Sequence, residues 1–380
     1  MEKKANKSGG LLRNNVVQSL LASILCILLG LFVGYIALLI VNASGAWGAI
    51  VAVVKNYLYY PSAAAQLKYL GSTLVKTSPL LMCSLSVLFA YKAGFFNIGA
   101  AGQYVGGAGA SLYFAIALGM PWYICILAAA VVGALMGAIS GALKAYRNVN
   151  EVISGIMLNW IGLYTVNMLL TTVKEPTSPY TTAVSKANSG ALIPDLGLSS
   201  LFSNNSYVTI AIPLAVIVAI VIWVLLEKTK FGYELKATGM NKEAAKYCGM
   251  REKRNTILTL AIAGGLAGMG AAFYYLTGIE QWSCSQTSVP SMGFNGIAAA
   301  FLGGLHPIGA IFSSYFIQHI TSGGAYVDKT LYCSQISDFI SSMIIYLCGF
   351  VFIFKLAMNR WLDKRDEKKA AKTHQEGGEA

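Results

Sequence analysis

The sequence predicts an all-α membrane protein with about ten transmembrane helices arranged in two inverted five-helix repeats. Three observations lead to this fold class. First, 56% of the 380 residues are hydrophobic and only 12% are charged, whereas soluble proteins carry roughly 25% charged residues. Second, the apolar residues form runs of about 20, the length that crosses a bilayer as a helix. Third, the net charge of +12 comes from basic residues that flank these apolar runs. This placement indicates how the chain is oriented in a membrane and does not indicate a nucleic-acid-binding surface.

Seven apolar runs are long enough to span a membrane at about 20 residues per helix. They lie at 17–42, 72–91, 97–119, 121–143, 151–173, 207–226 and 256–278. The first exceeds the roughly 7–15 apolar residues of a secretory signal, so we expect it to be retained. Two shorter, Gly-interrupted segments at 291–304 and 306–322 follow, either of which is a candidate re-entrant helix. A last run at 336–357 completes the expected ten.

Lys and Arg collect in three regions, and cytoplasmic segments are enriched in these residues. The regions are the N-terminal tail 1–16, the central loop 227–255 and the C-terminal tail 359–380. Six spans before the central loop and four after it place all three regions in the cytoplasm. Segments 43–69 and 174–206 then lie outside the cell, and the second, which is rich in Ser, Thr, Asn and Pro, is expected to be a solvated loop.

Lys76 lies within an otherwise apolar run. A charged residue inside a span is a functional candidate because its burial is costly. Lys76 is expected within about two turns of the external end, however, so its long side chain can reach the interface.

Two stretches resemble each other and indicate an internal repeat. They are Phe96–Ala101 and Phe294–Ala299, and each opens the third span of a five-span half. Because five is odd, the second half inserts upside down relative to the first. The membrane domain 17–358 therefore divides into repeat one, 17–173, and repeat two, 207–358. The alternative is a chance likeness between two runs of small residues.

Glycines spaced four residues apart form smooth strips along single helix faces. Such strips let neighbouring helix backbones pack closely. They occur at Gly133, Gly137 and Gly141, at Gly264 and Gly268, and at Gly102 and Gly106.

The sequence contains none of the motifs that we associate with catalysis or with nucleotide binding. It lacks a GxxxxGK loop followed by Ser or Thr, HExxH, GxSxG and a carboxylate pair within the spans. The seven cysteines are single, so no zinc site is expected. We therefore expect neither enzymatic activity nor a cofactor in this chain. If the protein does work, we expect the energy to come from a partner chain or from an ion gradient.

Ion-coupled carriers keep titratable residues within their spans. Here Asp338 and His319 are the clear candidates, and both lie near predicted span ends. Coupling to ATP on a partner chain is therefore favoured. An ion-coupled carrier and a membrane scaffold stay open as alternatives.

The central loop predicts a short cytoplasmic helix. Asn241 is a plausible N-cap, Glu243 lies in the first turn and Gly249 is a plausible stop. Ala244 and Ala245 have small side chains, so their slim helix face can enter a groove on another protein. The surrounding Lys and Arg can contact acidic residues at the edge of that groove, or lipid phosphates. The alternative is a plain basic connector.

This loop resembles the Glu-Ala-Ala coupling motif of ABC importer permeases, in which a short helix docks on the ATPase subunit. The residues that carry the likeness are Gly239, Asn241, Glu243, Ala244, Ala245 and Gly249. Three further stretches resemble the branched-chain amino acid/ribose permease superfamily, and the first two resemble its nucleoside-uptake branch. These are 96–103, 150–159 and 293–309, within a similarity that runs from Leu70 to the last span. One departure is Ala101, where that branch usually has Glu.

The resemblance implies the permease subunit of a bacterial nucleoside importer in the cell membrane. It also implies separate ATP-binding subunits, a second related permease and an external lipid-anchored nucleoside-binding protein. Simple sugars or branched-chain amino acids are the alternative substrates, since the same superfamily handles them.

Uncharged polar residues within apolar spans are candidates to line a substrate path, because they hydrogen-bond a neutral solute without trapping it. These are Asn97, Gln103, Asn159 and Asn295, and the rings of Phe96 and Phe294 are placed to stack on a base. Alternatively, the amides join helices through interhelical hydrogen bonds.

Cys284 and Cys333 are both expected outside the cell. This placement permits a disulfide between them, with free thiols as the default.

Overall fold

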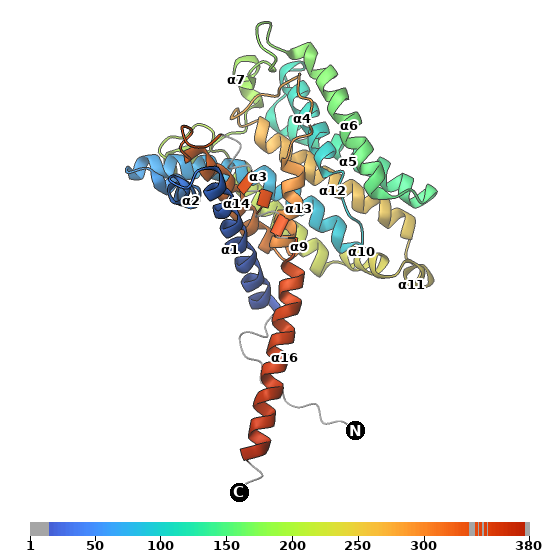
Figure 1. Ribbon diagram of the computed structural model, residues 1–380. Coiled ribbons are helices and arrows are strands. Elements are labelled where there is room, and N and C mark those ends of the chain that lie inside the picture. Colours follow the sequence, from blue (N-terminus) through green and yellow to red (C-terminus); the bar gives the residue numbers. More distant parts are fainter. Residues whose placement is uncertain (1–14, 334–338, 341, 344–345, 348, 377–380) are drawn as a thin grey trace.

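The computed structural model describes residues 15–333, 339–340, 342–343, 346–347 and 349–376 (Figure 1). Within these residues the chain is helical. Extended pairing is confined to two isolated bridges, Lys174 with Thr181 and Tyr180 with Ser283. The all-α class predicted from the sequence is therefore confirmed.

Six of the seven predicted long spans form helices with the length and apolarity to cross a bilayer. They are α1 (Asn15–Val41), α3 (Ala63–Lys92), α5 (Trp122–Arg147), α6 (Glu151–Leu170, extended by a 3-10 turn to Val173), α9 (Ala211–Lys228) and α12 (Glu252–Tyr275). The seventh, α4 (Ala100–Ile116), has 17 residues. The predicted short segments form α13 (Met292–Leu302) and α14 (Pro307–Gly323).

Shorter helices connect or extend these spans. They are α2 (Ala46–Lys55), α7 (Val184–Ala187), α8 (Leu198–Leu201), α10 (Lys230–Met240), α11 (Lys242–Tyr247) and α16 (Val351–Glu376). The predicted last span, 336–357, and Asp338 fall partly or wholly outside the described residues.

The predicted second span, 72–91, begins too late, because α3 starts at Ala63. Segment 43–69, which was expected outside the membrane, holds α2, a 3-10 turn at Asn56–Tyr59 and the first turns of α3. Lys76 consequently lies thirteen residues into α3, about 20 Å along the axis at 1.5 Å per residue, and not within two turns of the helix end. Helix α16 continues from the end of the last predicted span into the tail 359–380, as far as Glu376.

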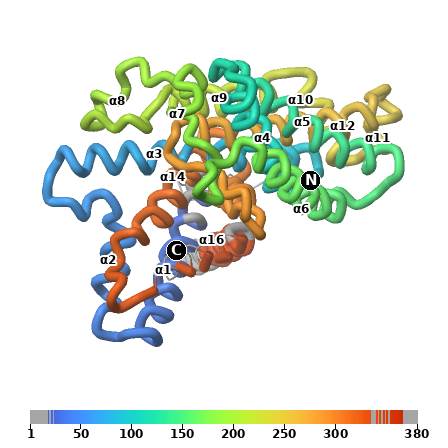
Figure 2. The backbone as a smooth tube through the Cα atoms, turned by 90° about the horizontal axis from the view of Figure 1, so that it is seen from above, coloured from blue at the N-terminus to red at the C-terminus, as the bar shows by residue number. Residues whose placement is uncertain are grey.

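The helices α3 and α12 form the centre of the bundle and contact each other. Each is the second span of its predicted half, and each packs on the third and fourth spans of the other half. Helix α12 packs on α4 and α5, and α3 packs on α13 and α14. Seen from above, α1, α2 and α16 lie together on one flank and α4–α6 with α10–α12 on the other (Figure 2).

Glycines make these central contacts possible, as their spacing predicted. A Cβ atom added at Gly264 of α12 would overlap the carbonyl oxygen of Gly133 on α5, and one at Gly107 of α4 would overlap the backbone of Gly268. On the other side of the core, a Cβ at Gly296 of α13 would lie 2.7 Å from the Cβ of Cys83 on α3. The helix backbones therefore touch directly.

Segment 174–206 is more ordered than the freely solvated loop expected from its composition. Val184, Ala191 and Ile193 are buried in it, and its first part pairs with the chain after α12. The amide of Thr181 donates to the carbonyl of Trp282 at 2.9 Å. Cys284 and Cys333 are both free thiols, as the default reading expected.

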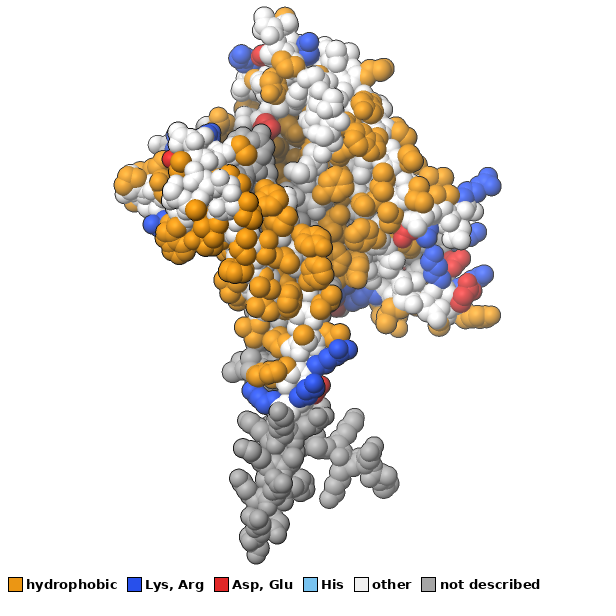
Figure 3. Space-filling model, viewed as in Figure 1, with side chains coloured by type: hydrophobic (Ala, Val, Ile, Leu, Met, Phe, Trp, Pro, Cys, Tyr) orange, Lys and Arg blue, Asp and Glu red, His pale blue; other side chains and the backbone are white. Residues whose placement is uncertain are grey.

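The surface has the distribution of a membrane protein. Apolar side chains cover the flanks of the bundle, while Lys and Arg gather near α11 and on α16 (Figure 3). The exposed apolar side chains include Leu127, Leu135, Ile161 and Ile217 on α5, α6 and α9. In water such a surface would be unfavourable, so these faces suit lipid.

Replacing Gly264 by Ala should prevent stable folding, because the added methyl meets a backbone carbonyl that cannot move aside, and overpacking costs about 1–3 kcal/mol or more. Gly48→Ala in α2 is the control, since a Cβ there meets nothing within 4 Å. Size-exclusion chromatography of detergent-solubilised protein should give a monodisperse peak for the control only. Equal peaks for both variants would contradict the packing.

Candidate functional site

The central loop folds into a helical hairpin, made of α10 and α11 with Asn241 between them. The Asn241 side-chain oxygen accepts a hydrogen bond from the amide of Ala244 at 3.0 Å, which caps α11. Gly249 has φ +79°, a left-handed conformation that suits glycine after a helix. The predicted cap, helix and stop are confirmed, but the loop holds two helices where one was expected.

Close contacts fix this hairpin to the ends of α3 and α12. A Cβ atom at Gly94, just after α3, would lie 2.7 Å from the Cα of Gly239 at the end of α10. Asn255 at the start of α12 donates from its side-chain nitrogen to the Thr238 hydroxyl at 3.0 Å. The Lys242 ammonium lies 5.7 Å from the centre of the Phe95 ring, a cation–π distance. Gly239 is therefore an attachment point for the hairpin.

The sequence analysis missed Gly94 and Phe95. The available signal was their position, directly before the Phe96–Asn97 motif. They connect the hairpin to that motif in space as well as in sequence.

The outer face of the hairpin carries large exposed apolar side chains between cations. Tyr247 is 91% exposed and Met240 is 88% exposed, and Lys242, Glu243, Ala244 and Lys246 are exposed around them. Aromatic and Met side chains are enriched in protein interfaces relative to the rest of the surface. The sequence analysis did not select Tyr247 or Met240.

Ala245 does not belong to this outer face. It is only 3% exposed and packs inward, so the predicted slim face of Ala244 and Ala245 is wrong for Ala245. The reason is helical geometry, because neighbouring residues on a helix point in directions about 100° apart. Ala244 is exposed, and Ala245 anchors α11 to the body of the protein.

Asn97 and Gln103 form a buried pair of amides at the start of α4. The Asn97 side-chain nitrogen donates to Gln103 Oε1 at 2.8 Å and lies 3.0 Å from the Ser86 hydroxyl oxygen of α3, while Gln103 Nε2 donates back to Asn97 Oδ1 at 3.2 Å. Both side chains are buried. This pair joins α3 to the segment that leads into α4.

Asn159 of α6 makes a similar link. Its side-chain oxygen accepts from the amide of Gly102 at 2.7 Å, and its nitrogen donates to the carbonyl of Ile98 at 3.2 Å. These bonds tie α6 to the first turn of α4. The geometry of Asn97, Gln103 and Asn159 corresponds to the alternative that the sequence left open, interhelical hydrogen bonding.

The second motif has a different environment. Asn295 is half-buried in α13, and its side chain makes no hydrogen bond to any described residue. Phe294 is 40% exposed, and Phe96 is half-buried. Phe294 and Asn295 lie inside α13, whereas Phe96 and Asn97 precede α4, so the two similar stretches differ in local structure.

The two motifs nevertheless meet in space. A Cβ atom added at Gly293 of α13 would overlap the backbone of Ala101 on α4. Ala101 is fully buried in this contact. The absence of a side chain at Gly293 and the small side chain at Ala101 let the two helices touch there.

Within the described residues, His, Cys, Asp and Glu form no group of three or more that is placed to hold a metal ion. His319 is engaged in local contacts, with Nε2 2.8 Å from the carbonyl oxygen of Val54 and Nδ1 3.3 Å from the Asn56 side-chain nitrogen.

Comparison with known proteins gives one family and several relatives. The family described as the branched-chain amino acid transport system / permease component matches residues 69–349. Helices α1 and α2 lie outside this match. No solved structure was found to match the chain.

Several curated relatives carry transport descriptions, among them these three. The nucleoside ABC transporter permease protein NupB of Lactococcus lactis is 30% identical over 354 residues, covering 91% of this chain and 94% of the relative. The guanosine ABC transporter permease protein NupP of Bacillus subtilis is 28% identical, covering 90% and 96%. The guanosine ABC transporter permease protein NupQ of the same bacterium is 29% identical, covering 64% and 78%.

Asn97→Ala should lower the thermal unfolding temperature of the purified protein by a few degrees. It leaves the buried Gln103 amide without a partner, which costs about 1–3 kcal/mol. Asn295→Ala is the matched control, because no described residue hydrogen-bonds to its side chain, and it should leave the unfolding temperature unchanged. Identical unfolding temperatures for the two variants would show that the Asn97 bonds do not hold the helices together.

Proposed function

This chain belongs to the branched-chain amino acid transport permease family, and we propose that it is the membrane-spanning subunit of an ATP-driven importer of nucleosides. The observation that carries the proposal is the match to the nucleoside permease NupB, at 30% identity over 91% of this chain and 94% of the relative. The match to the guanosine permease NupP has similar coverage at 90% and 96%. Both extend well beyond the family core at 69–349.

The packing supports two inverted five-span repeats, 17–173 and 207–358. Each half packs its second span on the third and fourth spans of the other half: α12 packs on α4 and α5, and α3 packs on α13 and α14. A two-fold axis that lies in the membrane plane and relates the two halves would produce this pattern. In this arrangement α4 and α13 occupy equivalent places, and their contact at Gly293 and Ala101 lies between the halves.

The hairpin faces the cytoplasm in the proposed orientation, together with both termini. Helix α12 starts beside the hairpin and has 24 residues, about 36 Å at 1.5 Å per residue. This length exceeds the roughly 30 Å of the hydrocarbon core, so the far end of α12 lies outside the cell. The basic residues of 227–255 and of 359–380 then follow the positive-inside rule.

A separate ATPase subunit docks on the outer face of the hairpin in this proposal. Tyr247, Met240, Glu243 and Ala244 supply the contact, and Lys242 and Lys246 meet acidic groups or lipid phosphates at its edge. Asn241 and Gly249 shape α11, and Ala245 and Gly239 hold the hairpin to the body. ATP is bound and hydrolysed by the partner, and this chain needs no cofactor of its own.

Movement of the hairpin reaches the membrane core through the contacts already described. Gly239 against Gly94 and Lys242 over Phe95 connect it to the end of α3. The next residues, Phe96 and Asn97, lead into α4. Asn295, Phe294 and Phe96 are the better candidates to contact the solute, because Phe294 is 40% exposed, Phe96 is partly exposed and no described residue hydrogen-bonds to the Asn295 side chain. Asn97, Gln103 and Asn159 act first as structural links.

The complete importer includes a second, related permease and an external lipid-anchored nucleoside-binding protein. Bacillus subtilis has two different guanosine permease proteins, NupP and NupQ, both similar to this chain. This supports a pair of unlike permeases. Sugars or branched-chain amino acids are the alternative cargo, and an ion-coupled carrier is the alternative mechanism.

The complex reconstituted in vesicles should accumulate labelled nucleosides in an ATP-dependent manner. Uptake of ribose and of leucine should be lower by about tenfold or more, because buried polar groups that pair with a base stay unpaired with the wrong solute. A non-hydrolysable ATP analogue serves as the control. Preferential uptake of ribose or leucine would overturn the nucleoside assignment, and uptake that needs no ATP would overturn the coupling.

The double variant Met240→Ala and Tyr247→Ala should lose the ATPase subunit during co-purification. Buried interface tyrosines often contribute about 2 kcal/mol or more to binding. Tyr123→Ala, an exposed tyrosine at the other end of the bundle, is the matched control and should retain the subunit. Retention of the ATPase by the double variant would exclude this face as the docking surface.

A further inference from the structure

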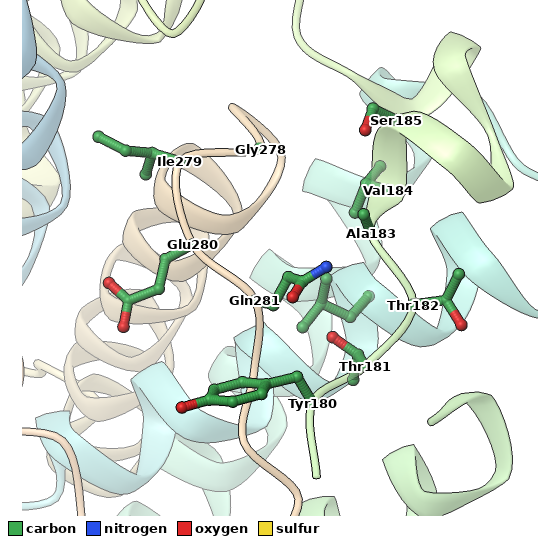
Figure 4. A pocket seen from close by; sticks show the side chains of 11 residues that line it. Tyr180, Thr181, Thr182, Ala183, Val184, Ser185, Gly278, Ile279, Glu280 and Gln281 are labelled. Atoms are coloured by element: carbon green, nitrogen blue, oxygen red, sulfur yellow. The ribbon is translucent and has the colours of Figure 1, made fainter. Parts of the chain in front are cut away.

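A cavity of about 370 Å³ lies at the end of α12 away from the hairpin. Its walls are the segments 180–185 and 278–281 (Figure 4), and Leu112 of α4 also lines it. The volume falls within the range of about 300–1,000 Å³ that is typical of small-molecule sites. In Figure 1, α7, which forms part of one wall, is at the top of the molecule, and α11 is at the lower right.

The walls of this cavity are held by hydrogen bonds between the two halves of the chain. Besides the bond from Thr181 to Trp282, the amide of Cys284 donates to the carbonyl of Pro179 at 2.8 Å. Trp282 is fully buried, and its indole nitrogen donates to the Asn167 side chain at 2.9 Å. The cavity is therefore a preformed site and not a gap between mobile loops.

Several polar groups at the cavity have hydrogen-bonding capacity to spare. Among the described residues, none hydrogen-bonds to the side chains of Gln281 or Ser185. Glu280 accepts a hydrogen bond from the Tyr274 hydroxyl on one carboxylate oxygen, which orients it and leaves the other oxygen for a ligand. The Tyr180 ring is 45% exposed, and it projects to the same side of segment 278–281 as the Glu280 carboxylate (Figure 4).

We propose that this cavity receives the nucleoside on the external side, before the solute enters the path between the repeats. The inference rests on the proposed function and adds a separate binding site to it. Glu280 accepts hydrogen bonds from the ribose hydroxyls, Gln281 donates to and accepts from polar edges of the base, and Tyr180 stacks on the base. Leu112 and Ile279 supply the apolar surface that small-molecule sites also need.

The charges of the lining residues favour a neutral solute. Glu280 is the one charged residue among the eleven that line the cavity. A free amino acid needs a cation for its carboxylate as well as an acceptor for its ammonium group, and the lining has no such cation. An aromatic ring beside hydrogen-bonding groups suits a nucleoside, because its planar base can stack on the ring while its hydroxyls and polar edges form hydrogen bonds.

Helices α4 and α12 are in backbone contact at Gly107 and Gly268, so a solute bound in the cavity has no passage between these two helices at that level.

Protection of an introduced thiol tests the site directly. In sealed right-side-out vesicles containing the complex, a membrane-impermeant maleimide is applied to a Ser185→Cys variant, and labelling of each thiol is measured by peptide mass spectrometry. A saturating nucleoside should slow labelling at position 185 by about fivefold or more. Labelling of native Cys333, and of a Ser189→Cys control on the same loop, should not change. Leucine should protect neither position.

A second measurement uses uptake kinetics. The Glu280→Gln substitution keeps an acceptor for the hydrogen bond from the Tyr274 hydroxyl. The double variant Glu280→Gln and Gln281→Ala should raise the KM for nucleoside uptake about tenfold, because two hydrogen bonds to the nucleoside are lost. Glu175→Gln, on the same loop but outside the cavity, is the control and should leave KM unchanged.

The outcomes separate the two proposals. Uptake without protection, and with an unchanged KM in the double variant, overturns the external site alone. Absence of ATP-dependent nucleoside uptake by the unaltered complex overturns the proposed function and the site together. Labelling of position 185 only after the vesicles are opened would place the cavity on the cytoplasmic side and overturn the inference.

Discussion

Direct backbone contact between α12 and its neighbours is the constraint on which the remaining structure depends. Gly264 against Gly133 and Gly268 against Gly107 bring α12 next to α5 and α4. In a bilayer, helices gain little from the hydrophobic effect on association, so close packing and polar links must supply the stability. Small residues on facing helix strips provide that closeness. The inter-half packing of α3 with α13 uses Gly296 in the same way.

The position of α12 also connects the two functional regions. Its first residue follows the hairpin that carries Tyr247 and Met240, and its last turn leads into Glu280 and Gln281 at the cavity. A helix locked by glycines to α4 and α5 moves as one body with them. Displacement of the hairpin would therefore be transmitted to the segment 278–281 at the cavity and, through Gly94 and Phe95, to the start of α4. The contacts provide a physical route for coupling.

Much of the fold was predictable because long apolar runs, glycine spacing and helix caps are local signals. The Asn241 cap and the Gly249 stop were read correctly for this reason. Helix α2 is apolar but was missed because its 10 residues fall short of the roughly 20 that span a bilayer. The early start of α3 was missed because its first turns, with Gln66 and Lys68, are mixed in polarity. The burial of Ala245 and the amide pair of Asn97 and Gln103 depend on which helices meet, and that is a tertiary property. The cavity was missed because it brings together 180–185 and 278–281, which are about a hundred residues apart.

The orientation of the hairpin is the claim on which coupling, direction of transport and the external site all depend, and two native thiols report on it. Cys248, beside α11, and Cys333, after α14, are both exposed. A membrane-impermeant maleimide applied to intact cells, with each cysteine measured by mass spectrometry, should label Cys333 at once and Cys248 only after the membrane is permeabilised. Labelling of Cys248 in intact cells, with Cys333 protected until permeabilisation, would contradict the account.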